Sequence, residues 1–146
     1  MSKKEKKSSV QNHQIWTRIG LAAISLLVVA GIVFGMSGCK KTLPPEISVV
    51  EAHQKYQEGT FLLDVRVQEE WDQAHVPGAT LIPLDELPNR IDEVPADQEI
   101  IVICYSGNRS SVGRDILLDA GFKQVTISKG GLIAWSAAGY SLEIQP

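Results

Sequence analysis

The segment EIIVICYSGNRSS (residues 99–111) joins an apolar run to a short polar loop and to the start of a helical pattern. The run at residues 99–104 is almost wholly apolar, which is typical of a strand buried on both faces of a parallel sheet. We expect the helix over residues 110–122, with Gly121 at its C-terminal cap. Cys104 therefore falls at the carboxyl end of a strand, where open α/β sheets bind ligands and helix N-termini present free N–H groups.

Shorter strands and helices alternate on both sides of this segment. A helix is expected at residues 47–59, with Ser48 as its N-cap and Gly59 at its end. Further expectations, in chain order, are a strand at 61–65, helical turns at 68–74, a turn and a strand within 76–84, an amphipathic helix that begins near Pro88 and runs to residue 94, a strand at 124–128, and a turn and helix at 130–140. This alternation predicts an α/β domain with a parallel sheet.

The loop CYSGNR (residues 104–109) can fold its amide groups around the sulfur of Cys104. Gly107 allows the positive φ that such a turn requires. Backbone N–H groups and a helix dipole favour the thiolate, and such settings lower a cysteine pKa from ~8.5 into the range ~3.5–7.5. The same cradle would hold a persulfide. The alternative is that Cys104 is a small buried strand residue without chemistry.

The first forty residues are predicted to be a targeting segment. A basic stretch at residues 1–18 is followed by a run at 19–39 without a charge, and about 20 apolar residues suffice to span a bilayer. MSGC (residues 36–39) also resembles a bacterial lipobox with Cys39 as the lipidated residue. We expect a signal peptide or membrane anchor at 1–38, a lipidation site and linker at 39–46, and a folded domain at 47–146. A lipidated Cys39 and an uncleaved membrane anchor both place the domain on the extracytoplasmic side of a bacterial cell membrane.

Charge and cysteine content exclude several classes of partner and site. Beyond the basic stretch the chain carries nine basic and sixteen acidic residues, so nucleic acid is not expected as a partner. With Cys39 at the membrane, Cys104 has no disulfide partner within the domain. The histidines are too scattered for a metal site, and none is expected.

Four segments resemble the single-domain rhodanese family of thiosulfate or persulfide sulfurtransferases. They are LLDVR (62–66), HVPGA (75–79), CYSGNRS (104–110) and GGLIAW (130–135). The resemblance implies a five-stranded parallel sheet flanked by helices and no metal or organic cofactor. It also implies that Cys104 is catalytic. Cys104 would take the outer sulfur of a small donor, form a persulfide, and pass the sulfur to cyanide or a thiol.

The resemblance also assigns residues that bind substrate or shape the loop. They are Tyr105, Ser106, Gly107, Asn108, Arg109, Ser110, Asp64 and Arg66. The loop residues would act chiefly through backbone N–H groups, whereas Arg109 either attracts anionic thiosulfate or holds the loop. Asp64 is expected to brace the loop, and Arg66 either shares that role or lies at the surface. His75 is expected to be a turn residue with satisfied hydrogen bonds, and Trp71 and Trp135 to be core residues.

Other functional classes are weighed against this one. A sulfur-carrier or regulatory module that docks a dedicated protein partner remains open. Cysteine phosphatases of a related fold place five residues between cysteine and arginine, whereas Cys104 and Arg109 are separated by four, too few for a tetrahedral oxyanion. A thiol-disulfide oxidoreductase lacks support, because the domain has no resolving cysteine.

Overall fold

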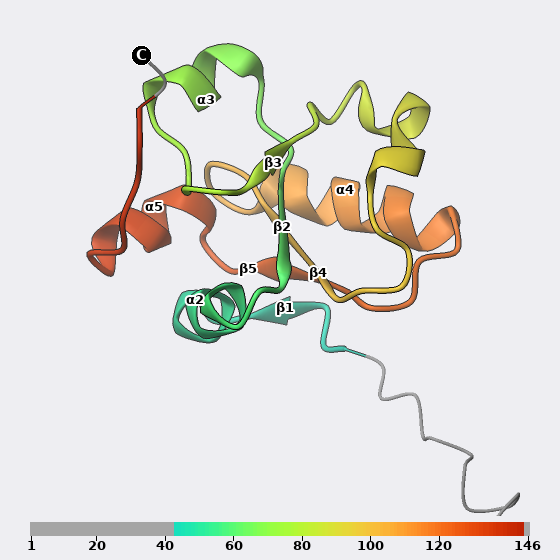
Figure 1. Ribbon diagram of the computed structural model, residues 1–146, viewed down its shortest axis with the longest axis horizontal. Coiled ribbons are helices and arrows are strands. Elements are labelled where there is room, and N and C mark those ends of the chain that lie inside the picture. Colours follow the sequence, from blue (N-terminus) through green and yellow to red (C-terminus); the bar gives the residue numbers. More distant parts are fainter. Residues whose placement is uncertain (1–42, 145–146) are drawn as a thin grey trace, which may run out of the picture. The chain divides into compact units, whose positions relative to one another are not determined.

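The computed structural model describes residues 43–144 as an α/β domain (Figure 1). The predicted targeting segment at 1–38 and Cys39 lie outside the described residues. Within the described part, no helix is both long enough and apolar enough to cross a membrane. In chain order the elements are β1 (Glu46–Ile47), α2 (Val49–Gln57), β2 (Phe61–Asp64), α3 (Gln68–Gln73), β3 (Thr80–Leu81), the 3-10 turns η1 (Leu87–Asn89) and η2 (Ile91–Glu93), β4 (Ile100–Ile103), α4 (Asn108–Asp119), β5 (Val125–Ser128) and α5 (Gly131–Ala137).

The strands form one sheet of five in the order β1-β5-β4-β2-β3. All four neighbouring pairs are parallel, which confirms the expected sheet. β2 and β4 lie side by side at its centre, with Asp64 in register with Ile103. The carboxyl ends of these two strands therefore meet at one edge of the sheet, where Asp64 and Cys104 come close in space.

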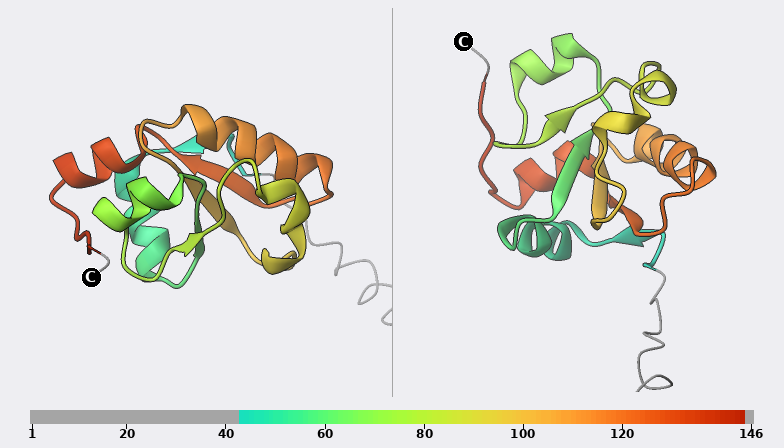
Figure 2. Two further views of the ribbon diagram at one scale, coloured as in Figure 1. Left: turned by 90° about the horizontal axis from the view of Figure 1, so that it is seen from above. Right: turned by 45° about the vertical axis from the view of Figure 1, so that its right-hand side comes forward.

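Successive side chains of the central strands pack into two separate cores. On one face, Val102 and Leu63 pack with Leu117 of α4 and with Leu87 of η1. On the other face, Ile101, Ile103 and Leu62 pack with Ala52 of α2 and with Trp135 of α5. Figure 2 shows the sheet between these two layers, with α4 on one side and α2 and α5 on the other. Both faces are buried, as the apolar run at residues 99–104 predicted.

Close packing of α4 on the sheet depends on Gly113. A Cβ at this position would lie 3.3 Å from Val65 Cγ1 and 3.4 Å from Val102 Cγ1. Real Cβ atoms rarely approach other atoms so closely, so glycine lets the helix axis come nearer to the strands. The N-terminal turn of α4 is thereby held against the carboxyl ends of β2 and β4.

Local signals at the first predicted helix are confirmed. Ser48 Oγ accepts a hydrogen bond from the Glu51 amide at 3.1 Å, as an N-cap does. Gly59 follows the helix with φ +93°, so the helix ends where the sequence indicated.

The helix expected to begin near Pro88 does not form. Two 3-10 turns take its place, and Arg90 between them departs from helical geometry. Pro83 and Pro95 bound this segment, and the residue before a proline avoids the α conformation. Leu87 and Val94 of this segment are nonetheless buried in the core.

The segment assigned to a linker at residues 39–46 is in part integral to the sheet. Glu46 belongs to β1, and the carbonyl oxygens of Pro44 and Pro45 accept hydrogen bonds from Thr126 Oγ1 and the Ile127 amide. Prolines suit an edge strand because their missing N–H groups leave no ladder position unsatisfied there.

Candidate active site

Cys104 lies directly after β4, and its side chain is almost fully covered, with 1% of the residue exposed. α4 begins four residues later, at Asn108. The amide of Gly107 donates a hydrogen bond to Cys104 Sγ at 3.1 Å. The side chains of Tyr105, Ser106 and Asn108 are exposed, so the loop turns its backbone rather than its side chains toward the sulfur.

The environment of Cys104 lowers its pKa. Burial alone would raise the pKa of the thiol, because desolvation disfavours the charged form. The hydroxyl of Ser110 and the backbone amides of Ser110, Gly107 and Ser106 outweigh this effect, and the pKa lies below its usual value. The thiolate is the nucleophilic form of cysteine, so the site favours attack by sulfur.

Ser110 has a distinct position beneath the loop. Its side chain is fully buried, and within residues 43–144 its Oγ has no hydrogen-bond partner inside normal distance limits. The hydroxyl still contributes to the lowered pKa of Cys104. A buried hydroxyl without a partner is uncommon, because leaving it unsatisfied is costly. It is a donor that an added sulfur atom or an anion could use.

Two glycines at the start of α5 allow this helix to hold the loop. The amides of Leu132 and Ile133 donate hydrogen bonds to the carbonyl oxygens of Cys104 (2.8 Å) and Tyr105 (3.1 Å). A Cβ on Gly131 would overlap the Cys104 carbonyl oxygen and would lie 2.7 Å from that of Tyr105. Gly107 also has a positive φ of +108°, as the loop required. The motif at residues 130–135 contains this glycine pair, and two glycines at a helix start are a sign of close backbone approach, but the sequence does not show which carbonyl oxygens lie against them.

Asp64 and Arg66 form a buried ion pair beside the loop. Their side chains are 0% and 2% exposed, so Arg66 is not at the surface. Asp64 accepts from the Arg66 backbone amide and from its guanidinium, at distances of 2.6 to 3.0 Å. Arg66 also donates to the carbonyl oxygens of Glu70 and Ala74, at 3.1 and 2.8 Å. The pair therefore connects the end of β2 to α3, and the hydrogen bonds described for the Asp64 carboxylate go to Arg66 rather than to residues 104–110.

Arg109 points to α3. Its Nη1 and Nη2 donate to the two carboxylate oxygens of Glu70 at 2.5 and 2.7 Å. Both side chains are about one-third exposed, at 34% and 31%. This pair ties the start of α4 to α3, and attraction of an anionic donor by Arg109 stays a prediction. Glu70 was not identified from the sequence, because it lies 39 residues from Arg109 and belongs to no motif.

His75 and the two tryptophans have the structural roles expected of them. The ring nitrogens of His75 contact the Trp71 carbonyl oxygen (3.0 Å) and Glu143 Oε1 (2.9 Å), and the ring stacks on Trp71 at 3.8 Å between centroids. Trp135 is 1% exposed in the core. Both ring nitrogens of His75 are thus engaged by acceptor oxygens.

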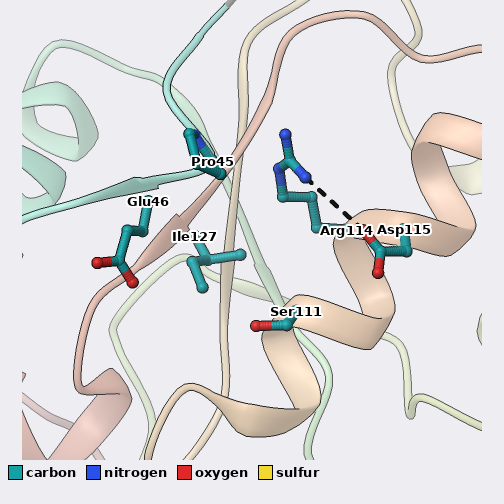
Figure 3. A pocket seen from close by; sticks show the side chains of 6 residues that line it. All are labelled: Pro45, Glu46, Ser111, Arg114, Asp115 and Ile127. Carbon is teal, nitrogen blue, oxygen red and sulfur yellow. Dashed lines mark ion pairs between the residues drawn. The ribbon is translucent and has the colours of Figure 1, made fainter.

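A separate pocket lies between α4 and the β1–β5 edge of the sheet (Figure 3). It measures about 170 Å³ and is lined by Pro45, Glu46, Ser111, Arg114, Asp115 and Ile127. On the α4 side of the pocket, Arg114 Nη1 lies 3.6 Å from Asp115 Oδ1. The pocket contains no residue of the predicted site, and the cysteine chemistry belongs elsewhere. Among residues 43–144, no group of three or more histidine, cysteine or acidic side chains is arranged to hold a metal ion.

Comparison with known proteins identifies similar sequences. A family model described as "Rhodanese-like domain" matches residues 48–138. The chain is 39% identical over 94 residues to "Putative sulfur carrier protein YrkF" of Bacillus subtilis (strain 168), a match that covers 63% of this chain and 51% of that protein. It is 34% identical over 82 residues to "Sulfurtransferase" of Allochromatium vinosum, covering 56% of this chain and 77% of that protein. The chain therefore spans about half the length of the Bacillus relative.

Solved structures share the fold. The solution structure of a rhodanese-like domain from an Anabaena protein superposes with a TM-score of 0.64 at 27% identity, covering 70% of this chain and 80% of that one. The segment matched by the family model contains β2, the loop at residues 104–110 and the glycines that begin α5. Every element that positions Cys104 lies inside the matched segment.

Proposed function

Because this chain belongs to the rhodanese-like domain family, we propose that it is a sulfurtransferase in which Cys104 carries the transferred sulfur as a persulfide. The observation that carries the proposal is the amide cradle of Cys104. The Gly107 N–H lies 3.1 Å from the sulfur, and the loop lowers the pKa of a thiol that burial alone would raise. A preformed thiolate needs no general base, which agrees with a His75 whose nitrogens are already engaged.

In the first half of the cycle, the Cys104 thiolate attacks the outer sulfur of a donor. A bond forms between the two sulfurs, the bond from the outer sulfur to the rest of the donor breaks, and the leaving group keeps that electron pair. With thiosulfate the leaving group is sulfite. The persulfide remains anionic, and amides that stabilise the thiolate also stabilise this charge. The buried Ser110 hydroxyl is a further donor for the added sulfur.

In the second half, a thiophilic acceptor attacks the outer sulfur. The new bond joins that sulfur to cyanide or to a thiolate, and the S–S bond to Cys104 breaks with its electrons returning to Cys104. A thiol with a lowered pKa is a better leaving group in such exchange. The same cradle therefore assists both attack and departure.

A second function is favoured by one comparison. The name of the Bacillus subtilis relative describes a sulfur carrier, so a module that hands its persulfide to a dedicated protein is the alternative. The carrier would load in a single turnover and discharge slowly to small thiols or cyanide. The enzyme would turn over steadily with thiosulfate and cyanide. Comparing single-turnover loading with steady-state rates separates the two.

The test of the shared intermediate is intact mass spectrometry after incubation with thiosulfate. We expect the full chain to gain the mass of one sulfur atom and peptide mapping to place it on Cys104. Cys104→Ser should neither gain sulfur nor turn over thiosulfate, while keeping the circular dichroism of the native fold. A serine variant that still turns over thiosulfate, or sulfur found only on Cys39, would contradict the proposal.

We also propose that residues 1–39 attach the domain to a bacterial cell membrane on its extracytoplasmic side. The basic stretch at 1–18, the uncharged run at 19–39 and the lipobox-like MSGC support this location. Donor and acceptor would then be compounds or proteins available outside the cytoplasm.

A further inference from the structure

We propose that Glu70 sets the charge selectivity of the sulfur donor: by neutralising Arg109, it lowers the preference of the site for dianionic thiosulfate relative to donors with a single negative charge. The inference rests on the proposed transfer of sulfur to Cys104. It assigns Glu70 as a positioning residue that acts through Arg109 and does not touch the reacting atoms.

The geometry of the pair carries the first step. Glu70 accepts from both terminal nitrogens of Arg109, at 2.5 and 2.7 Å. Such a bidentate arrangement uses the guanidinium edge that would otherwise bind a sulfonate or carboxylate on a donor. Both side chains remain about one-third exposed, so the pair lies where a solute can reach it.

Arg109 is also within electrostatic range of the reacting sulfur. The hydrogen bonds to Glu70 are the main reason that its pKa is raised, and the Cys104 thiolate and Asp64 contribute in the same direction. Arg109 is therefore the cation whose charge a donor approaching Cys104 would feel, and Glu70 cancels that charge.

Among the described residues near the loop, no other cation takes the place of Arg109 in attracting an anionic donor. Arg66 is buried against Asp64, and Lys129, which precedes the two glycines of α5, binds Glu46 at 2.8 Å. From residue 42 onward the chain carries sixteen acidic and seven basic residues, so the surrounding field is negative. A dianion approaches such a site with twice the electrostatic cost of a monoanion.

Thiosulfate and methanethiosulfonate form a matched pair of probes. Both present a terminal sulfur bonded to a sulfonyl sulfur, but thiosulfate carries two negative charges and methanethiosulfonate carries one. Attack by Cys104 gives the same persulfide from either, with sulfite or methanesulfinate as the leaving group. A change in the reactivity of Cys104 acts on both donors, whereas a change in local charge acts more strongly on thiosulfate.

The experiment compares Glu70→Gln with Glu69→Gln in the full chain. Glu69 is an exposed neighbour on the same helix, so its variant removes the same charge without freeing Arg109. The readout is kcat/KM for each donor with cyanide as acceptor. In a two-step transfer this value reports the donor half alone. We expect the ratio of kcat/KM for thiosulfate to that for methanethiosulfonate to rise about three- to tenfold in Glu70→Gln at low salt. It should stay near the wild-type ratio in Glu69→Gln, and added salt should shrink the difference.

Arg109→Gln tests the same pair with the opposite sign. It leaves Glu70 without its partner, so the ratio should fall below wild type, and this variant keeps the inference testable if Glu70→Gln does not fold. An unchanged ratio in a folded Glu70→Gln, or an equal rise in Glu69→Gln, would overturn the role of Glu70. A wild type that acquires no sulfur on Cys104 from either donor would instead refute the proposed function.

Discussion

At the scale of single residues, Cys104 shows how a buried thiol can be acidic. Only 1% of the residue is exposed, a setting that raises the pKa of an isolated thiol. Hydrogen-bond donors of Ser110, Gly107 and Ser106 outweigh this effect and lower the pKa of Cys104. A donor hydrogen bond to the charged form has this effect because it is stronger in the thiolate than in the thiol.

The lowered pKa predicts a pH dependence. Alkylation of Cys104 by iodoacetamide, followed on its peptide by mass spectrometry, should rise with pH to a plateau with a midpoint below the free-thiol value of ~8.5. Sulfur transfer should be lost as pH falls through the folded-state pKa. A folded pKa below the unfolded one also stabilises the native state above the unfolded pKa, and this contribution likewise disappears as pH falls through the folded pKa. A midpoint at or above ~8.5 would rule out the preformed thiolate.

Gly107→Ala should separate the effect of the amide groups around Cys104 Sγ from the effect of backbone strain alone. Alanine at φ +108° costs about 1–2 kcal/mol, and the loop should relax in a way that withdraws the amide from Sγ. We expect the pKa of Cys104 to rise and kcat/KM at neutral pH to fall about tenfold, because a smaller fraction of the thiol is then ionised. Gly59→Ala is the matched control, because Gly59 has φ +93° with nothing within 4 Å of its missing Cβ. Equal losses of activity in both variants would argue against the cradle.

At the scale of elements, four elements hold the loop. β4 delivers Cys104, α4 begins at Asn108, and the amides at the start of α5 bind the loop carbonyls. α3 adds the ion pair between Glu70 and Arg109. Rigid elements hold a reactive group more accurately than a free loop could.

Gly131→Ala tests the contribution of α5. The added Cβ would overlap the Cys104 carbonyl oxygen, so the helix and the loop must separate. We expect a loss of about 2–4 kcal/mol in the free energy of unfolding, measured by urea denaturation, together with reduced sulfur loading. Gly139→Ala has a similar positive φ of +77° but meets nothing within 4 Å, and should cost only about 1–2 kcal/mol with loading preserved. Matching effects at the two glycines would show that the contact with the loop is unimportant.

At the scale of the whole molecule, the proposed attachment to a membrane is tested at Cys39. If Cys39 is the lipidation site, Cys39→Ser should lose labelling by a radioactive or clickable fatty acid and leave an unprocessed precursor that remains membrane-bound. A wild type that runs at precursor mass without lipid would instead indicate an uncleaved anchor. A chain that fractionates entirely with the soluble proteins would contradict both versions.

Much of the fold follows from short-range patterns. The apolar run before Cys104 predicted a central buried strand, and Ser48 and Gly59 marked the ends of a helix, because strand burial and helix caps are decided within about ten residues. At residues 85–94, by contrast, the prediction from local patterns was wrong. Amphipathic spacing there indicated a helix, but prolines on both sides left only two 3-10 turns.

The sequence by itself determined the candidate site: one cysteine at a strand end, followed by a glycine-containing loop and a helix. Only the tertiary structure decided what surrounds it. The partner of Arg109 lies 39 residues away in α3, the donors to the loop carbonyls come from α5, and β1 forms because the segment assigned to a linker pairs with β5. Such contacts join segments that are distant in the sequence and meet only once the sheet has formed. No local spacing encodes which carboxylate will meet which guanidinium.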